Sequence, residues 1–172
     1  MPPIQLLIPD DDQNIGPEPA ELHRDPCYRC ASVGDLSRLP DADAALAEAD
    51  ALSLHQRLVP ATEGNVGPAD LAAMKPDALL VNASRAELIA PGALEAALDA
   101  GRPGFAALDV FEQEPVYDPN HPLLLRPNVL CSPHLGYAEE ASYRQYLEIA
   151  YRNAARFFDG DTSHVLNPEI LI

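Results

Sequence analysis

The sequence predicts an α/β protein that is built on a parallel sheet and ends in a long helix. Three observations support this fold class. From residue 41 onward, short apolar runs alternate with segments of helical periodicity. The short runs are apolar throughout rather than at every second residue, which is typical of strands in a parallel sheet. The last periodic segment, at about 138–158, is much longer than the earlier ones.

Strand and helix signals follow one another in a regular order between residues 41 and 131. The expected elements are a helix from 41 or 43 to 48, a strand at 51–54, a helix from 68 to 74, a strand at 78–81, a helix from 91 to 100, and strands at 105–110 and 129–131. Asp41 or Asp43 supplies the N-cap of the first helix. Pro68 and Pro91 stand where helices begin, and Gly101 stands where one ends.

The final helix is expected from about Ala138 to Phe158, and Gly160 ends it. Its apolar face is formed by residues at helical spacing, namely Leu147, Ala150, Tyr151, Ala154 and Phe158. We therefore expect one long amphipathic helix close to the C-terminus.

Residues 1–40 differ in character from the rest of the chain. Ile4–Ile8 predicts a short buried strand, and acidic, turn-rich sequence follows it without sustained periodicity up to residue 40. The first fifty residues hold eleven acidic and three basic side chains. We therefore divide the chain into a short N-terminal segment at 1–40, with one strand and then mostly irregular structure, and a main domain at 41–172.

Composition restricts the classes of partner. The chain has 172 residues, 27 acidic and 11 basic side chains, and a formal net charge of −16. Such a charge repels nucleic acid and anionic membrane surfaces, so neither is an expected partner. No apolar run approaches the roughly 18–20 residues of a membrane span. The start of the chain lacks the basic region of a signal peptide, and we expect a cytoplasmic protein.

The cysteines indicate reduced thiols rather than a disulfide framework or a metal site. Three cysteines, an odd number, fit no secreted disulfide framework. Cys27 and Cys30 form one C-x-x-C, which could be half of a zinc site or a redox pair. A structural zinc site needs four ligands, and the sequence has no second C-x-x-C. Two loop thiols without a metal are the favoured interpretation.

Residues with useful chemistry follow the predicted strands, at the edge where parallel sheets bind ligands. Arg85 could clamp a carboxylate with two parallel hydrogen bonds. His134 could donate or accept a proton near neutral pH, and Glu112 or Glu114 could orient its ring. Asp109 follows a third strand. Taken singly, each of these residues is more often structural than catalytic, as a loop pin, a turn cap or a packed side chain.

Four segments together resemble one family. They are Ala49–His55, Met74–Arg85, Ala107–Pro115 and Asn128–Gly136, with a further likeness at Val165–Glu169. In order and spacing they are similar to the C-terminal two-thirds of the nucleotide-binding domain of the D-isomer-specific 2-hydroxyacid dehydrogenases. The resemblance implies an incomplete doubly wound, Rossmann-like sheet, with residues 41–172 as a partial NAD-binding domain.

The resemblance also implies roles for individual residues. Arg85 would bind the substrate carboxylate and polarise the adjacent carbonyl, and His134 would protonate the carbonyl oxygen or accept that proton in reverse. Glu114 would pair with His134 and raise its pKa, and Asp109 would contact the nicotinamide end of NAD. The residues implied to lie along the cofactor are His55 with the loop after it, Ala83, Ser84, Arg85, Asp109, His134 and Gly136.

The sequence departs from the family pattern in two places. Ala86 and Glu87 follow the arginine, where the common motif has glycine. The nine glycines include no G-x-G, so the turn that brings the backbone close to a pyrophosphate is missing. Ile4–Gln13 resembles the first strand of the family's substrate domain, most of which has no counterpart. We therefore expect a shortened chain with weakened or lost NAD binding, and an uncovered sheet that favours a homo-oligomer.

Two functions of different classes follow. The first is an NAD-dependent oxidoreductase that interconverts a small 2-oxo acid and a D-2-hydroxy acid; the presence of Arg85, Glu114 and His134 favours it. The alternative is a non-catalytic remnant that acts as an oligomerising or binding module, which the missing glycine turn favours. A third possibility is that a partner subunit completes the site.

Overall fold

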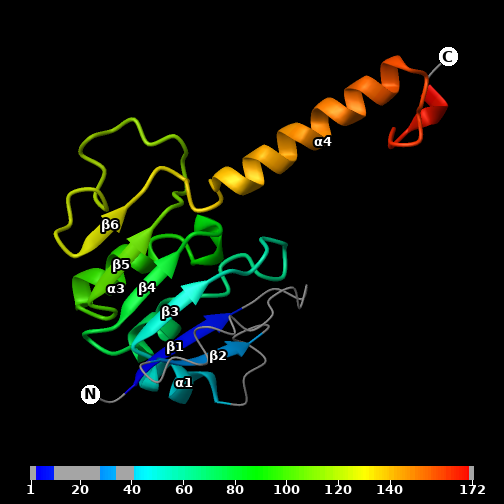
Figure 1. Cartoon of the computed structure of the whole chain (residues 1–172). Coiled ribbons are helices and arrows are strands. Elements are labelled where there is room, and N and C mark those ends of the chain that lie inside the picture. Colours follow the sequence, from blue (N-terminus) through cyan, green and yellow to red (C-terminus); the bar gives the residue numbers. More distant parts are fainter. Residues whose placement is uncertain (1–2, 10–27, 34–40, 171–172) are drawn as a thin grey trace. The chain divides into compact units, whose positions relative to one another are not determined.

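A computed structural model describes residues 3–9, 28–33 and 41–170. The described strands form one six-stranded sheet in the order β2-β1-β3-β4-β5-β6, and all their pairings are parallel (Figure 1). The strands are β1 Ile4–Pro9, β2 Tyr28–Val33, β3 Ala51–Leu54, β4 Leu79–Asn82, β5 Phe105–Leu108 and β6 Val129–Cys131. This confirms the predicted α/β class with a parallel sheet.

The helices divide between two compact units, residues 1–134 and residues 135–172. The helical elements of the first unit are α1 Ala42–Glu48, α2 Pro68–Ala73, α3 Ala93–Ala100 and the 3-10 helix η2 Ala86–Leu88. The second unit contains the long helix α4, Glu140–Phe158, and the 3-10 helix η3, Pro168–Ile170. The predicted long C-terminal helix is therefore present. None of the described helices is long and apolar enough to cross a membrane.

Local sequence explains where the short helices begin and end. Asp41 is the N-cap of α1, and its side chain accepts a hydrogen bond of 3.1 Å from the Ala44 amide. Pro68 occupies the first turn of α2, where its missing N–H costs nothing. The helix α3 begins two residues later than Pro91 predicts, because Gly92 adopts a left-handed conformation with φ 69°. Gly101, with φ 75°, ends it as expected.

One face of the sheet packs against α1, α2 and α3 (Figure 1). The strands present alternate residues to this core, as their burial pattern shows. The core side chains from strands and helices include Leu46, Leu52, Leu71, Leu80, Leu98 and Leu108. This packing fixes β3, β4 and β5 side by side, and it therefore fixes the residues that follow their carboxyl ends.

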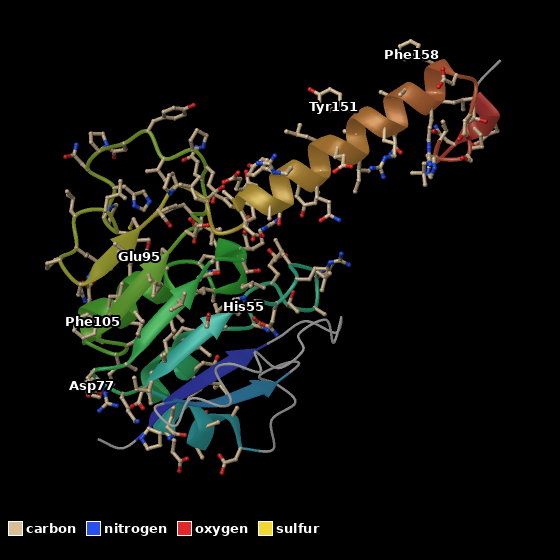
Figure 2. The ribbon with its side chains drawn as sticks, viewed as in Figure 1. His55, Asp77, Glu95, Phe105, Tyr151 and Phe158 are labelled. Atoms are coloured by element: carbon tan, nitrogen blue, oxygen red, sulfur yellow. The ribbon has the colours of Figure 1, made fainter. Side chains whose placement is uncertain are left out.

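Apolar side chains on the opposite face of the sheet are exposed. Phe105, labelled in Figure 2, is 50% exposed, Leu130 is 72% exposed and Ile4 is 44% exposed. The strand registers place all three on the side of the sheet that faces away from the core.

The N-terminal forty residues differ from expectation in one element. Mostly irregular structure was expected after Ile4–Ile8, but Tyr28–Val33 forms β2. This strand has no apolar periodicity, and within the described sheet it lies at one edge and pairs only with β1. Residues 28–33 form a strand because they pair with β1, and not because their own sequence has a strand pattern.

The first strand also has an unexpected neighbour. Ile4–Gln13 resembled a strand of the family's substrate domain, but β1 lies between β2 and β3, so one sheet continues across residue 40.

The Asp50 carboxylate accepts hydrogen bonds of 2.7 Å from the Gln5 amide and 2.7 Å from Lys75 Nζ. These bonds hold the pKa of Asp50 below its usual value, the Gln5 amide contributing most.

The C-x-x-C hypothesis falls largely outside the described residues, because Cys27 does. Among the residues that the structure describes, no group of three or more His, Cys, Asp or Glu side chains is placed to hold a metal ion.

Candidate active site

The candidate residues follow the carboxyl ends of neighbouring strands. Strand order reverses between β1 and β3, because β2 continues the sheet on one side and β4 on the other. In open parallel sheets, ligands bind at the carboxyl edge near such a reversal. His55 follows β3, Arg85 follows β4, Asp109 follows β5 and His134 follows β6. The alignment of the strands therefore brings residues from four distant parts of the chain to one edge.

His134 and Glu114 form the central pair of this edge. The Nδ1 atom of His134 lies 2.7 Å from Oε2 of Glu114. The other carboxylate oxygen of Glu114, Oε1, accepts a hydrogen bond of 2.9 Å from the Phe111 amide. Of the two acids that the sequence offered as partners, Glu112 and Glu114, Glu114 makes the contact. The imidazole ring is thereby oriented with Nε2 on the side away from the carboxylate.

The environment of Glu114 keeps it ionised. The hydrogen bond with His134 is the main cause that lowers its pKa below the usual 4.5. Partial burial opposes this shift, whereas the Phe111 amide and the charges of His134 and Arg85 add to it. The backbone of His134 is left-handed, with φ 55°, which is uncommon for a residue other than glycine. This conformation marks a backbone that its surroundings hold in place.

A buried asparagine supports the loop that carries Arg85. Asn82 is 1% exposed, and its Nδ2 donates to the Arg85 carbonyl at 2.9 Å. Its Oδ1 accepts from the Ser84 amide at 3.1 Å, and Ser84 Oγ donates to the Gln56 carbonyl at 2.7 Å. The loops after β3 and β4 are therefore tied together. The guanidinium of Arg85 is exposed and donates to the Ser84 carbonyl at 2.7 Å.

Asp109 is held at the end of β5 by the end of β6. It is 6% exposed, and its Oδ1 accepts a hydrogen bond of 2.5 Å from Ser132 Oγ. The Ser132 amide donates to the Leu108 carbonyl at 2.9 Å, which continues the pairing of the two strands. Asp109 is therefore a fixed, largely buried carboxylate at this edge.

The remaining predicted residues are less closely grouped. His55, labelled in Figure 2, is exposed and makes a hydrogen bond of 2.8 Å with Ser53 of its own strand. Ala83 is exposed beside Ser84. Gly136 belongs to the second compact unit. The structure thus brings Glu114 and His134 into contact, and Arg85 is close enough for its charge to lower the pKa of Glu114.

A hollow of about 420 Å³ adjoins the His134–Glu114 pair. Its other walls are mostly apolar and include Phe111, Pro115, Val116, Cys131 and Pro133. Partial burial raises the pKa of the Cys131 thiol, so this cysteine stays protonated and is a poor nucleophile. The hollow is a mostly apolar space beside the imidazole of His134.

Sequence reasoning gave no individual role to Asn82 or Ser132, and it placed Gln56 only in the loop after His55. Each of the three takes part in a hydrogen bond that holds a candidate residue or its loop in place, and none was singled out by a motif of its own. The one available signal was a polar residue at the end of an apolar strand, as Asn82 is in β4.

Known proteins match most of this chain. A sequence model described as "D-isomer specific 2-hydroxyacid dehydrogenase, NAD binding domain" matches residues 28–136. A hydroxypyruvate reductase from Blautia hydrogenotrophica is 35% identical over 130 residues, which cover 76% of this chain and 40% of that protein. A glyoxylate reductase from Aeropyrum pernix is 38% identical over 127 residues, or 73% of this chain and 38% of the relative.

A solved structure extends the likeness. The structure of a putative D-3-phosphoglycerate dehydrogenase from Ralstonia solanacearum has a TM-score of 0.81 and 36% identity, covering 96% of this chain and 51% of that one. The chain spans about 40% of the length of the two curated relatives.

Proposed function

The chain belongs to the family of D-isomer-specific 2-hydroxyacid dehydrogenases, and we propose that it interconverts a small 2-oxo acid and the corresponding D-2-hydroxy acid with NAD(P). The observation that carries this proposal is the 2.7 Å contact between His134 Nδ1 and Glu114 Oε2 at the strand edge that also carries Arg85. An oriented histidine beside an ionised carboxylate is suited to general acid and base catalysis.

Each residue of the site has a distinct part in the proposed reaction. Arg85 binds the carboxylate of the 2-oxo acid, because its guanidinium matches two carboxylate oxygens. His134 donates a proton from Nε2 to the carbonyl oxygen as the alcohol forms, and it accepts that proton in the reverse direction. Glu114 keeps Nδ1 as the hydrogen-bond donor and stabilises the imidazolium.

The residues at the strand edge fit the nicotinamide half of the cofactor. Asp109, held by Ser132, and the loop of Ala83 and Ser84 would contact it, and His55 and Gly136 would lie along the rest. Bound NADH or NADPH would supply the hydride. Residues 10–27, between β1 and β2, lie outside the described part of the chain, and the sequence contains no G-x-G there or elsewhere. We therefore expect cofactor binding to be weaker than a complete glycine turn allows.

The substrate is proposed to be small. The two relatives described above are named for hydroxypyruvate and glyoxylate. The hollow beside His134 is mostly apolar apart from Glu114, Ser132 and the histidine itself. A short 2-oxo acid with a one- or two-carbon substituent is the substrate class that fits this space.

A second candidate function rests on a different observation. The sequence contains no G-x-G, so the turn that brings the backbone close to a pyrophosphate is missing. This absence favours a non-catalytic remnant that acts as an oligomerising or binding module. A cytoplasmic location and self-association belong to either proposal, and in the enzyme a second subunit would complete the site.

Steady-state kinetics separates the two functions. We expect the purified chain to oxidise NADH or NADPH in the presence of glyoxylate, hydroxypyruvate or pyruvate, and to form only D-lactate from pyruvate. His134→Ala is the matched inactive variant. Turnover that is absent with every 2-oxo acid, in a chain that is folded and binds the cofactor, would contradict the enzyme proposal and favour the remnant.

A further inference from the structure

The last residue of β4, Asn82, is a polar side chain in an apolar environment. It is 1% exposed, and it lies on the same face of the strand as Leu80, two residues earlier. The parallel registers set it beside Leu54 of β3 and Leu108 of β5, which are both buried. An amide among leucines lowers stability unless its donor and its acceptor are hydrogen-bonded. The partners of Asn82 therefore indicate why an amide stands at this position.

Both polar groups of the Asn82 side chain bind the loop that follows the strand. Its Oδ1 accepts from the Ser84 amide at 3.1 Å, which is the hydrogen bond of an Asx turn, and its Nδ2 donates to the Arg85 carbonyl at 2.9 Å. Residues 83–85 are therefore wrapped around one buried amide group. Because both partners are main-chain atoms, Asn82 fixes the backbone of Arg85 and leaves the guanidinium exposed.

The backbone of Arg85 is also held from its other side. Its carbonyl accepts a second hydrogen bond, of 3.3 Å, from the amide of Leu88 in the 3-10 helix η2, and Leu88 is fully buried. The middle of the loop is tied to the loop after β3, because Ser84 Oγ donates to the Gln56 carbonyl at 2.7 Å. Loss of the Asn82 side chain would therefore release the Arg85 backbone on one side, while the neighbouring anchors remain.

We propose that Asn82 is a positioning residue for recognition of the substrate carboxylate, an inference that rests on the proposed function. By holding the Arg85 backbone, Asn82 sets where the guanidinium meets a carboxylate bound beside His134. Two parallel hydrogen bonds between these groups require placement within about 0.5 Å. The charge of Arg85 helps to lower the pKa of Glu114, which supports a position close to the pair of His134 and Glu114.

Asn82 also connects the loop of Arg85 to the cofactor side of the proposed site. The Asp109 amide donates to the Asn82 carbonyl at 2.9 Å, where β4 and β5 end side by side. Asp109, which is proposed to contact the nicotinamide, therefore stands next to the residue that holds Arg85. A shift of the Arg85 loop would move the 2-oxo acid relative to the hydride donor, and a misplacement of about 1 Å can lower a rate about 100-fold.

Selectivity between a charged and an uncharged substrate isolates this role. Pyruvate carries a carboxylate, whereas methyl pyruvate presents the same ketone beside a neutral ester. We expect Asn82→Ala to lower kcat/KM for pyruvate by about 10- to 100-fold, mainly through KM, and to lower kcat/KM for methyl pyruvate much less. A general loss of structure would lower both values by the same factor. Because both substrates are assayed on one preparation, the ratio does not depend on how much of the chain is folded.

A double-mutant cycle tests whether Asn82 acts through Arg85. Arg85→Ala and Asn82→Ala should each lower kcat/KM for pyruvate. The double variant should be no worse than Arg85→Ala alone, because the loop then has no guanidinium to position. Two independent structural effects would instead multiply, and multiplied effects would overturn the proposal.

Two further variants separate the hydrogen bond to Arg85 from effects on folding. In Asn82→Ser, the shorter hydroxyl can still accept from the Ser84 amide but does not reach the Arg85 carbonyl, so selectivity for pyruvate should fall although the turn remains. The matched control is Asn128→Ala. Asn128 lies just before β6, and its Nδ2 donates to the Gly104 carbonyl at 2.8 Å. This control should keep the wild-type selectivity within about twofold.

Steady-state kinetics of the full chain with NADH or NADPH distinguishes the possible failures. A wild type that reduces neither substrate would overturn the proposed function and this inference with it. An active wild type, with both substrates affected equally by Asn82→Ala, would overturn the role of Asn82 alone. So would wild-type selectivity in Asn82→Ser, or an equal loss of selectivity in Asn128→Ala. Circular dichroism shows whether each variant is folded, and if Asn82→Ala does not fold, Asn82→Ser decides the outcome.

Discussion

The Nδ1 atom of His134 lies 2.7 Å from Oε2 of Glu114, although the two residues are 20 positions apart in the sequence. The contact exists because Glu114 belongs to the loop after β5 and His134 to the loop after β6, and these strands are neighbours. A carboxylate placed in this way makes the distal nitrogen of the ring available for proton transfer in a defined tautomer. The proposed activity rests on this relationship.

Replacement of His134, the proposed proton donor, should stop turnover and leave the binding of cofactor intact. We expect His134→Ala to lower kcat by about 100-fold or more, as is usual for a general acid. The dissociation constant of NADH should change little, because the imidazole acts on the carbonyl oxygen. Stopped-flow or steady-state assays with calorimetric binding measure both quantities. His164→Ala, a histidine of the second unit, is the control; full activity in His134→Ala would exclude the mechanism.

Loss of the guanidinium should affect both binding and chemistry. We expect Arg85→Ala to raise KM for the 2-oxo acid and to lower kcat, with kcat/KM reduced by about 10- to 100-fold for a charged hydrogen-bonded contact. Arg85→Lys should recover part of the loss, because it restores the charge but not the two-pronged geometry. Arg144→Ala, which removes an exposed arginine from α4, should leave kcat/KM unchanged. An unaltered KM in Arg85→Ala would remove this residue from the site.

The pair of His134 and Glu114 should make stability depend on pH. The pKa of Glu114 is lowered in the folded chain, so its ionised form is stabilised relative to the unfolded chain. This contribution is fully present above the usual glutamate pKa of 4.5 and disappears as the pH falls through the lowered value. The difference in Tm between wild type and Glu114→Gln should therefore be constant near neutrality and shrink in acid. A difference that grows as the pH falls would contradict the ionised pair.

Gly104 should tolerate no side chain. A Cβ atom at this position would lie 2.0 Å from the Pro76 carbonyl oxygen, so the backbone would have to move. We expect Gly104→Ala to lower the free energy of unfolding by about 2–4 kcal/mol, in the range of overpacked buried sites. Gly67→Ala is the matched control, because its Cβ would meet a side-chain oxygen at an ordinary 3.5 Å. Chemical denaturation measures both; equal stability of the two variants would refute the close approach.

Local sequence predicted the elements that local chemistry determines. The strands at 51–54 and 129–131 have the predicted bounds, and Asp41 caps α1. Strong apolar runs and a capping side chain act within a few residues, so a single sequence reveals them. The strand β2 was missed, because its pairing with β1, rather than its own pattern, makes it a strand.

The candidate site could be predicted only in part, because some of its contacts join segments that are distant in the sequence. Arg85, Glu114 and His134 were recognisable from motifs whose order resembles a known family, and the structure places His134 Nδ1 2.7 Å from Glu114 Oε2. Ser84 Oγ donates to the Gln56 carbonyl and Ser132 Oγ donates to Asp109, and these bonds join residues that are 28 and 23 positions apart. Such contacts depend on which strands are neighbours, so no local pattern indicates them, whereas Asn82 acts locally on the Arg85 carbonyl three residues away.

The most direct test of the proposed function is a calorimetric titration of the purified chain with NADH and NADPH. Heat is the suitable signal, because the chain contains no tryptophan. The proposal predicts saturable binding at micromolar to low-millimolar dissociation constants, with one cofactor per chain. No detectable heat of binding, from a chain whose circular dichroism shows that it is folded, would contradict the proposed function. It would mean that Arg85, Glu114 and His134 are present in a chain that does not bind NADH or NADPH.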